Sequence, residues 1–342
     1  MNTVDQQSPE ARTVRDVAHG RWKAEVLAAV LDLDLPQVLD AQPRSVAELG
    51  RAVGADHSGL ARLLELAAAL GLCTQVNGQY SACRVTELLR EDTNGSMRIE
   101  CLHVLSSWGR IAWSETATAV RTGSSGFRAA TGMSVFDYLA VHPDEAATFH
   151  AFQAEVTRRN ACALIRADLL PSTGCLVDVG GGTGTLLCAL LEAGPARTGV
   201  VFDRPEVVGQ PDVPTMGGRL SWASGHFFTE DGAEELPRDR NVYLLSHVLH
   251  DWADTDAATI LRLVTGCMAP TSRVVVLENV LRPDRPNLLV SYLNMLMLAA
   301  WGSVERTVPE YVGLLDEAGL DLVSDRLLVP ATGLTALVAK RR

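Results

Sequence analysis

The sequence predicts an α/β protein with two parts: a mainly helical domain at residues 1–105 and a sheet-containing domain at residues 106–342. In the first part, apolar residues recur three and four positions apart, which is the spacing of a helix with one buried face. From about residue 175 onward, short β-rich runs alternate with helical stretches, which is typical of a doubly wound, mostly parallel sheet. A glycine-rich loop follows the first of these runs directly.

The first domain carries the pattern of a winged helix. Residues 45–56 and 57–72 predict two helices joined by a turn, and residues 73–86 predict a short hairpin with Asn77-Gly78 at its turn. A winged helix can read DNA or serve as a compact oligomerisation module. The formal net charge of −11 favours the second role, because nucleic-acid binding depends on Lys and Arg. Residues 106–170 continue the helical pattern and predict a connector.

The second domain contains the predicted strands of the larger sheet. In chain order these runs are CLVDV, TGVVF, VYLLS, RVVVLE, LDLVSDRLLV and LTALVAK. The last two are joined by a Pro-Ala-Thr-Gly link that is too short for a crossover helix, so we expect them to be antiparallel. Helical stretches separate the earlier strands, and we expect those strands to be parallel.

Composition excludes several classes of function. Apolar residues make up 47% of the 342 residues, which is enough for two buried cores. The acidic balance argues against a nucleic-acid partner and against an anionic membrane surface. The first residues are polar and no apolar run has membrane-spanning length, so we expect neither a signal peptide nor a membrane span. Seven cysteines without a C-x-x-C pair indicate free thiols, and we therefore expect a cytoplasmic protein.

The glycine loop after CLVDV lies where open α/β sheets bind their ligands. A nicotinamide-binding loop usually reads G-x-G-x-x-G, but Thr185 stands where the third glycine would fall. Gly180 and Gly182 let the backbone approach a ligand closely. Asp178, just before them, suits a cofactor with a cationic amino group, such as the methionine moiety of S-adenosylmethionine. Asp203, at the end of the second strand, can accept both ribose hydroxyls.

Five segments of the chain resemble those of the plant caffeate-type and bacterial natural-product O-methyltransferases, which tailor polyketides and antibiotics. In chain order they are VDVGGGTG, FDRPEVV, HVLHDW, LENVL and ERTVPEYVGLLDEAGL. The resemblance implies a class I methyltransferase, Rossmann-like sheet, mostly parallel with the last strand antiparallel, and an amino-terminal winged-helix domain that forms a homodimer. It also implies S-adenosylmethionine as the cofactor, S-adenosylhomocysteine as its product, and a small aromatic acceptor from secondary metabolism.

Methyl transfer from a sulfonium needs an acceptor held in line with the S–CH3 bond and a base that removes the acceptor's proton. A neutral histidine suits this task when the acceptor is a phenol. The resemblance implies that His250 is the base. It also implies that Glu278 and Glu305 flank His250, orient its ring and stabilise its protonated form.

The resemblance assigns further residues to the cofactor and acceptor sites. Cofactor contacts are expected from Asp178, Gly180, Gly182, Asp203, His226, Phe227, Ser246 and Asp251. The acceptor pocket is expected to include Phe149, Phe152, Gln153, Asn294, Met297 and Trp301. The last three fall on one face of a helix predicted at residues 291–301, and a core stripe is an equally good interpretation of that face.

Two positions depart from the family pattern. His226 replaces the acid that commonly contacts the adenine amine, and Gln153 stands where a methionine is common. A third position suggests an alternative chemistry, because His247 and His250 are spaced as a metal-binding pair. Since the sequence offers neither a helix there nor a clear third ligand, we do not expect a metal.

Two alternative functions remain open at this point. One is a C- or N-methyltransferase, or a non-methylating relative, on the same fold. The other is a winged-helix regulator that uses a methyltransferase-like domain as a ligand sensor. The predicted recognition helix carries only Arg62 against Glu65, and this weak basic character disfavours the regulator.

Overall fold

The computed structural model describes residues 8–208, 215–228 and 235–342. The chain divides into two compact units, one of residues 1–110 with 142–152 and one of residues 111–141 with 153–342. The domain bounds predicted from the sequence, 1–105 and 106–342, stay a prediction. The two compact units differ from them in that residues 142–152 belong to the unit that contains the amino-terminal part of the chain. Residues 1–7, on which part of the signal-peptide expectation rests, lie outside the described residues.

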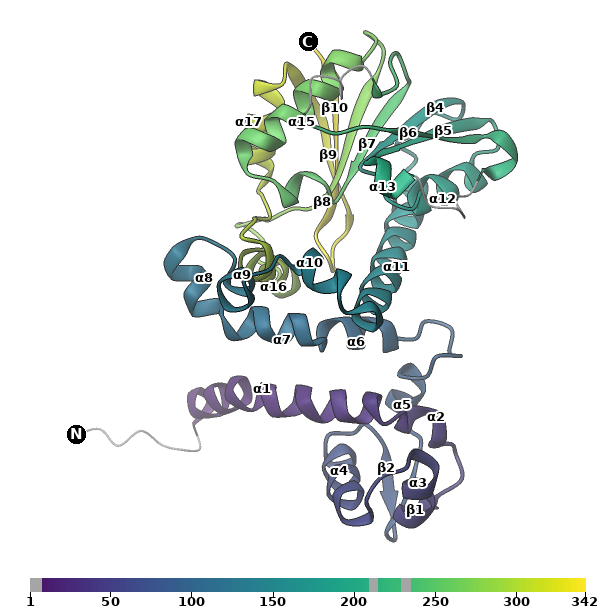
Figure 1. The fold of residues 1–342 in the computed structure, drawn as a ribbon, viewed down its shortest axis with the longest axis vertical. Coiled ribbons are helices and arrows are strands. Elements are labelled where there is room, and N and C mark those ends of the chain that lie inside the picture. The colour runs from purple at the N-terminus through teal and green to yellow at the C-terminus, as the bar shows by residue number, and fades with distance from the viewer. Residues whose placement is uncertain (1–7, 209–214, 229–234) are drawn as a thin grey trace, which may run out of the picture. The chain divides into compact units, whose positions relative to one another are not determined.

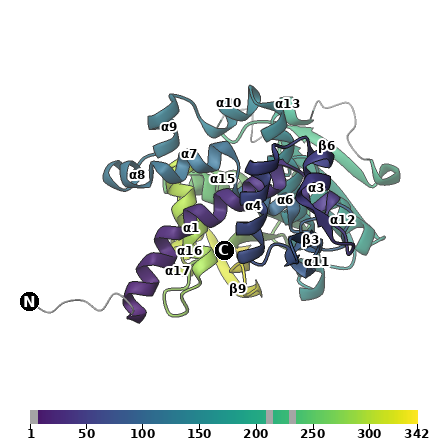
Figure 2. The ribbon, with the colours of Figure 1, turned by 90° about the horizontal axis from the view of Figure 1, so that it is seen from below.

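The first unit is mainly helical (Figures 1 and 2). Its helices are α1 (Pro9–Asp32), α2 (Leu35–Val38), α3 (Val46–Val53), α4 (His57–Ala69), α5 (Arg84–Leu88) and α6 (Arg98–Val104), with parts of α7 (Ser107–Ser114) and α11 (Pro143–Ala167). A small antiparallel sheet has the order β1-β3-β2, with β1 at Arg44–Ser45, β2 at Thr74–Val76 and β3 at Gln79–Ser81. The long helix α1 is continuous in both views.

The predicted winged-helix order of helix, turn, helix and hairpin is confirmed, and local signals explain it. Ser45 and Glu48 form a capping box that starts α3, and the carboxylate of Asp56 caps α4. At the hairpin turn, Asn77 and Gly78 both have positive φ angles, 51° and 77°, as a tight two-residue turn requires. Strand β1, which pairs with β3, was not predicted.

In the described residues, the second unit contains a seven-stranded sheet with the order β6-β5-β4-β7-β8-β10-β9. The strands are β4 (Gly174–Val179), β5 (Arg197–Asp203), β6 (Leu220–Ser224), β7 (Val242–Ser246), β8 (Arg273–Asn279), β9 (Leu320–Val329) and β10 (Leu334–Arg341). Strands β4 to β8 pair in parallel, and β10 is antiparallel to both β8 and β9. The fold class and the antiparallel final pair are therefore confirmed. Strand β6, with the weakly apolar sequence LSWAS, was not predicted.

Helices cover both faces of this sheet and produce two apolar cores. One core joins alternate strand residues to α15 (Asp254–Cys267) and α17 (Val308–Glu317), which lie together in Figure 1. The other joins the intervening strand residues to α12 (Thr185–Ala193) and the end of α11. The remaining helices are α8 (Thr116–Thr122), α9 (Gly126–Thr131), α10 (Val135–Ala140), α13 (Pro205–Val208) and α16 (Leu288–Leu296). Because both faces are buried, the strands are apolar almost throughout.

The predicted continuous helix at residues 291–301 is wrong in one respect. The α-helix α16 ends at Leu296, and residues Met297–Trp301 form a π-helix. A π turn contains more residues than an α turn, so Asn294, Met297 and Trp301 do not keep the spacing of a single α-helical face. Met297 is 7% exposed, which fits the core-stripe interpretation at that position.

Two expectations from composition can be compared with the structure. Among the described residues, no helix combines the length and the apolar character needed to cross a bilayer. The seven cysteines all lie in the described residues, and none of them forms a disulfide bond there.

We predict that the sheet core responds strongly to a cavity. Leu244, on central strand β7, has no exposed surface, so Leu244→Ala should lower the free energy of unfolding by about 2–5 kcal/mol. Leu288→Ala is the matched control, because Leu288 is 69% exposed and its truncation should change stability by about 0.5 kcal/mol or less. Chemical denaturation of both variants measures the difference, and equal losses would contradict this assignment of the core.

Candidate active site

The glycine loop connects β4 to α12 at the carboxyl edge of the sheet, as predicted. Gly180 has a φ of +75°, and its N–H donates to the carbonyl of Phe202 on the neighbouring strand β5. A side chain at Gly181 would lie 2.7 Å from the carboxylate of Asp178, so this position excludes any larger residue unless Asp178 moves. The backbone N–H of Gly182 donates to Oδ2 of Asp203 at 2.8 Å. Both predicted acids thus lie against the same loop.

Asp178 is buried, and its Oδ2 has no hydrogen-bond partner among the described residues. Burial, assisted by the negative charge of Asp203, raises the pKa of Asp178 to about 7. A carboxylate oxygen left unpaired in this way is costly unless a ligand satisfies it. Gly182, three residues past the end of strand β4, which bears Asp178, has open space where a Cβ would lie. An unpaired acid beside open space fits the cationic amino group of S-adenosylmethionine.

The other predicted cofactor residues follow the ends of neighbouring strands. Phe227 is half-buried. Its ring atom Cζ would lie 3.6 Å from a Cβ added at Gly180, so the ring borders the glycine loop. His226, which precedes it, is exposed. Ser246 ends β7, and Asp251 lies one residue beyond the predicted base. Since β4, β5, β6 and β7 are adjacent in the sheet, these residues share its carboxyl edge.

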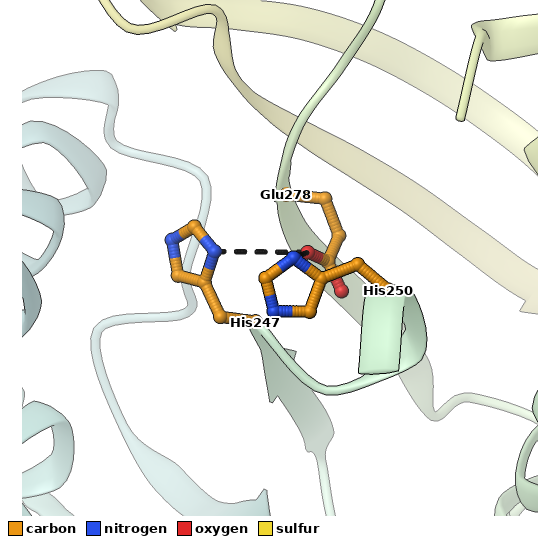
Figure 3. Close-up of side chains that lie close together, drawn as sticks. All are labelled: His247, His250 and Glu278. Carbon is orange, nitrogen blue, oxygen red and sulfur yellow. Dashed lines mark ion pairs between the residues drawn. The ribbon is translucent and has the colours of Figure 1, made fainter. Parts of the chain in front are cut away.

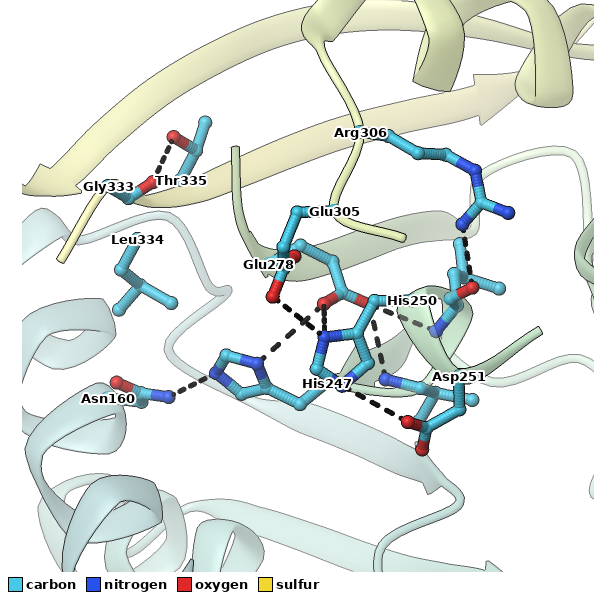
Figure 4. A network of polar contacts seen from close by, with 12 residues as sticks. Asn160, His247, His250, Asp251, Glu278, Glu305, Arg306, Gly333, Leu334 and Thr335 are labelled. Atoms are coloured by element: carbon cyan, nitrogen blue, oxygen red, sulfur yellow. Dashed lines mark hydrogen bonds and ion pairs between the residues drawn. The ribbon is translucent and has the colours of Figure 1, made fainter. Parts of the chain in front are cut away.

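The predicted base, His250, lies in a short 3-10 turn (Leu249–Asp251) just after β7, with carboxylates on both sides of its ring (Figure 4). Its Nδ1 lies 3.1 Å from Oε1 of Glu305 and 3.6 Å from Oε2 of Glu278. Its Nε2 lies 3.6 Å from Oδ1 of Asp251. Burial alone would lower the pKa of His250, but the charges of Glu278, Asp251 and Glu305 outweigh it and raise the pKa to about 10.

Glu278, at the end of β8, organises the loop that carries His250. Its side chain has no exposed surface, and its Oε1 accepts hydrogen bonds from the backbone N–H groups of Val248 and Leu249 at 3.1 and 2.9 Å. Its Oε2 faces the two histidines. Burial raises the pKa of Glu278 to about 7, although the positive charge of His250 opposes this shift.

Two residues that hold the site in place were not identified in these roles from the sequence. The buried guanidinium of Arg306 donates to the carbonyls of Leu249 and Trp252 at 2.7 and 2.6 Å, and to Asp254 at 2.9 Å. It therefore ties the histidine turn to the segment that carries Glu305. Asn294, expected in the acceptor pocket, accepts a hydrogen bond from the backbone N–H of Glu305 at 3.0 Å. The only sequence signal for Arg306 is its position next to a predicted site acid.

The remaining predicted pocket residues belong to different parts of the chain. In the first unit, Phe149 is buried and packs edge-on against Trp108, and Phe152 stacks on His103 at 4.0 Å between ring centroids. In the second unit, Gln153 is exposed, Met297 is buried and Trp301 is half-buried. Their contacts with an acceptor stay a prediction.

His247 is also part of the polar network, which the sequence did not predict. It has a positive φ of 53°, and its Nε2 lies 2.8 Å from Nδ2 of Asn160. Its Nδ1 lies 3.7 Å from Oε2 of Glu278 (Figure 3). Burial and the charge of His250 lower the pKa of His247 to about 3, so its ring is neutral. The sequence showed no third ligand to accompany His247 and His250 in a metal site. In the structure, Glu278 takes that position.

Known protein families match both parts of the chain. Residues 113–321 match the family model of the O-methyltransferase domain, and residues 16–92 match that of the O-methyltransferase dimerisation domain. The chain is 30% identical over 336 residues to the mitomycin biosynthesis 6-O-methyltransferase of Streptomyces lavendulae, covering 96% of this chain and 94% of that protein.

Solved structures extend the likeness to the whole fold. The mitomycin 7-O-methyltransferase MmcR has a TM-score of 0.87 at 28% identity, covering 97% of this chain and 98% of its own. CalO1 is a methyltransferase of calicheamicin biosynthesis solved with S-adenosylhomocysteine bound. It has a TM-score of 0.82 at 27% identity, and the match covers 99% of this chain and 100% of the CalO1 chain. The two matched domain models and the relative at 30% identity show that the chain belongs to the S-adenosylmethionine-dependent O-methyltransferase family.

Proposed function

We propose that this enzyme methylates a phenolic hydroxyl of a small aromatic natural product and that His250 is its general base. The observation that carries the proposal is the contact of 3.1 Å between Nδ1 of His250 and Glu305, with Glu278 at 3.6 Å on the same nitrogen. Carboxylates at Nδ1 favour the tautomer that carries its proton there. The lone pair of Nε2 is then available to the acceptor.

The carboxylates also stabilise the product of proton transfer. When Nε2 takes a proton, the ring becomes a cation between Glu278 and Glu305, and their charges offset that cation. The pKa of about 10 for His250 is close to that of an ordinary phenol, also about 10, so proton transfer between them costs little free energy. S-adenosylmethionine supplies, when bound, a methyl group on a cationic sulfur. Glu278, Glu305 and Arg306 hold the base in position.

We further propose how the predicted residues divide between cofactor and acceptor. Asp178 pairs with the cationic amino group, Asp203 accepts the ribose hydroxyls, and Phe227 packs against the adenosine. Gly180, Gly182, His226, Ser246 and Asp251 complete the cofactor site. Phe149, Phe152, Gln153, Met297 and Trp301 form the acceptor pocket. Asn294 acts as a positioning residue through Glu305, in line with its hydrogen bond to the Glu305 backbone.

A homodimer through the amino-terminal unit is the quaternary structure that we propose. The match of residues 16–92 to a dimerisation-domain model supports it. Helix α1 also exposes the apolar residues Val14, Val17 and Trp22, at 70%, 77% and 65% of their surface. Apolar side chains gathered in this way mark an interaction surface. We also propose a cytoplasmic location, since cysteines without disulfide bonds are typical of a reducing compartment.

His250→Ala should lower kcat/KM by about 100- to 10,000-fold, because the acceptor's proton then has no base. The variant should keep its affinity for S-adenosylmethionine, measured by isothermal titration calorimetry, whereas Asp203→Ala should lose affinity. In the wild type, kcat/KM should rise with pH as the neutral ring becomes more abundant, and His250→Ala should lack this rise. Full activity in His250→Ala would contradict the assignment of the base.

The affinity for S-adenosylmethionine should increase with pH. In the free protein the pKa of Asp178 is about 7, and a cationic ligand favours the ionised carboxylate. Below this pKa the carboxyl must lose a proton before it can pair, so affinity should fall by up to about tenfold per pH unit. Above it, affinity should reach a plateau. Calorimetric titrations between about pH 5.5 and 8.5 test this, and Asp178→Asn should bind weakly and without the pH dependence.

Trp22→Glu should weaken the dimer, because a charge would have to be buried in an apolar interface. Analytical ultracentrifugation at several protein concentrations measures the change. Lys23→Glu is the matched control, since Lys23 lies on the side of α1 opposite Val14 and its contact with Asp16 is exposed. A wild type that sediments as a monomer at every concentration would rule the dimer out.

A further inference from the structure

We propose that His247, His250 and Glu278 form a binding site for a divalent transition-metal cation of the Zn²⁺ type, and that the bound cation switches methyl transfer off. The three residues converge from two adjacent strands, with the histidines just after β7 and the glutamate in β8 (Figure 3). One ligand atom from each lies within 4.8 Å of the others.

The distances suit a cation held between these atoms. Oε2 of Glu278 lies 3.7 Å from Nδ1 of His247 and 3.6 Å from Nδ1 of His250. Zn²⁺ binds histidine nitrogen and carboxylate oxygen at about 2.0–2.2 Å, so ligand atoms around it are separated by roughly 3–3.6 Å. The ligand atoms lie within 4.8 Å of one another, so an inward movement of the side chains is needed to bring all three to that distance. Imidazole and carboxylate together are ligands that suit Zn²⁺ and its neighbours in the first transition row.

The oxygen at the centre of this cluster is short of hydrogen bonds. Oε2 of Glu278 has no hydrogen bond among the described residues, although its side chain has no exposed surface. The other oxygen is already used by two backbone N–H groups, so the carboxylate is held with Oε2 directed at the histidines. Oε1 of Glu305 lies 3.1 Å from Nδ1 of His250, so this carboxylate borders the cluster without being one of its three ligands. A cation would satisfy Oε2 of Glu278.

In both histidines, the ring nitrogen that would not bind the metal lies near a polar side chain. A histidine bound to metal through Nδ1 carries its proton on Nε2 and donates it to a nearby acceptor. Nε2 of His247 lies 2.8 Å from the side-chain amide of Asn160, whose oxygen reaches the same place after rotation of the amide. Nε2 of His250 lies 3.6 Å from Oδ1 of Asp251 (Figure 4).

This arrangement makes the cation an inhibitor. Metal at Nδ1 of His250 places the proton on Nε2, so Nε2 has no lone pair left to accept the proton of the acceptor. This inhibition rests on the proposed role of His250 as the base, whereas metal binding itself does not. The two can therefore be tested separately.

The first test measures binding without catalysis. Zn²⁺ is titrated calorimetrically into the full-length wild-type protein, and Co²⁺ is used to record visible spectra. We expect a single cation per chain and Co²⁺ bands typical of nitrogen and oxygen ligands, without the intense near-ultraviolet absorption of a thiolate ligand. His247→Asn should lose this binding, and Asn160→Ala should weaken it by about 10- to 100-fold. Asparagine tolerates the positive φ at position 247, so the first variant should fold, which its melting temperature verifies.

His57→Asn is the matched control, because His57 is exposed and belongs to the first unit. It should bind Zn²⁺ as the wild type does. Absence of binding to the wild type, or binding that His247→Asn leaves intact, would overturn the site.

The second test measures methylation with and without Zn²⁺, each variant compared with its own metal-free rate. We expect reversible inhibition of the wild type and of His57→Asn, restored by a chelator, and little inhibition of His247→Asn. If Zn²⁺ binds at the site yet the rate is unchanged or increased, the inhibitory link is wrong while the metal site stands, and the His250→Ala kinetics decide separately whether His250 is the base. If the wild type methylates normally but binds no Zn²⁺, the metal site is wrong and the role of His250 as the base is unaffected.

Discussion

The burial of Glu278 is the constraint on which the geometry of the site depends. A carboxylate with no exposed surface is costly unless its oxygens are satisfied. One oxygen accepts the N–H groups of Val248 and Leu249, and this fixes the turn after β7 in the conformation that presents His250. The opposite charge of His250 offsets part of the remaining cost. The acid and the base therefore position each other, and Arg306 holds both from outside through the carbonyls of the same turn.

Parallel strand order explains why residues far apart in sequence meet here. The carboxyl ends of β4, β5, β7 and β8 lie along one edge, so the glycine loop, Asp203, His250 and Glu278 need no long-range loop to come together. Glu305 reaches the edge differently, on the segment before α17, where Arg306 and Asn294 secure it. Proton transfer thus depends on two kinds of support: regular sheet pairing for the base and side-chain hydrogen bonds for its second acid.

The sequence predicted what local patterns determine. The winged helix, the antiparallel final strands and the glycine loop follow from turn chemistry, link length and spacing, each of which is local. Strand β6 was missed because LSWAS has little apolar alternation, and its place is set by pairing with β5. The contact of Asn294 with Glu305 and that of Asn160 with His247 join residues distant in sequence, which no local pattern records. The family resemblance implied that Glu278 flanks His250, but no local pattern indicated that it also neighbours His247.

The π turn at Met297–Trp301 sets the length of chain between α16 and Glu305. A π turn arises when one residue more than an α-helix needs is accommodated within a turn. Removing a single residue from it would let the helix continue in α geometry and rotate everything beyond it by roughly 100° relative to Asn294. The backbone amide of Glu305 would then lose its register with that side chain. The extra residue therefore acts as a spacer, and insertions or deletions in this helix are constrained by an acid several residues away.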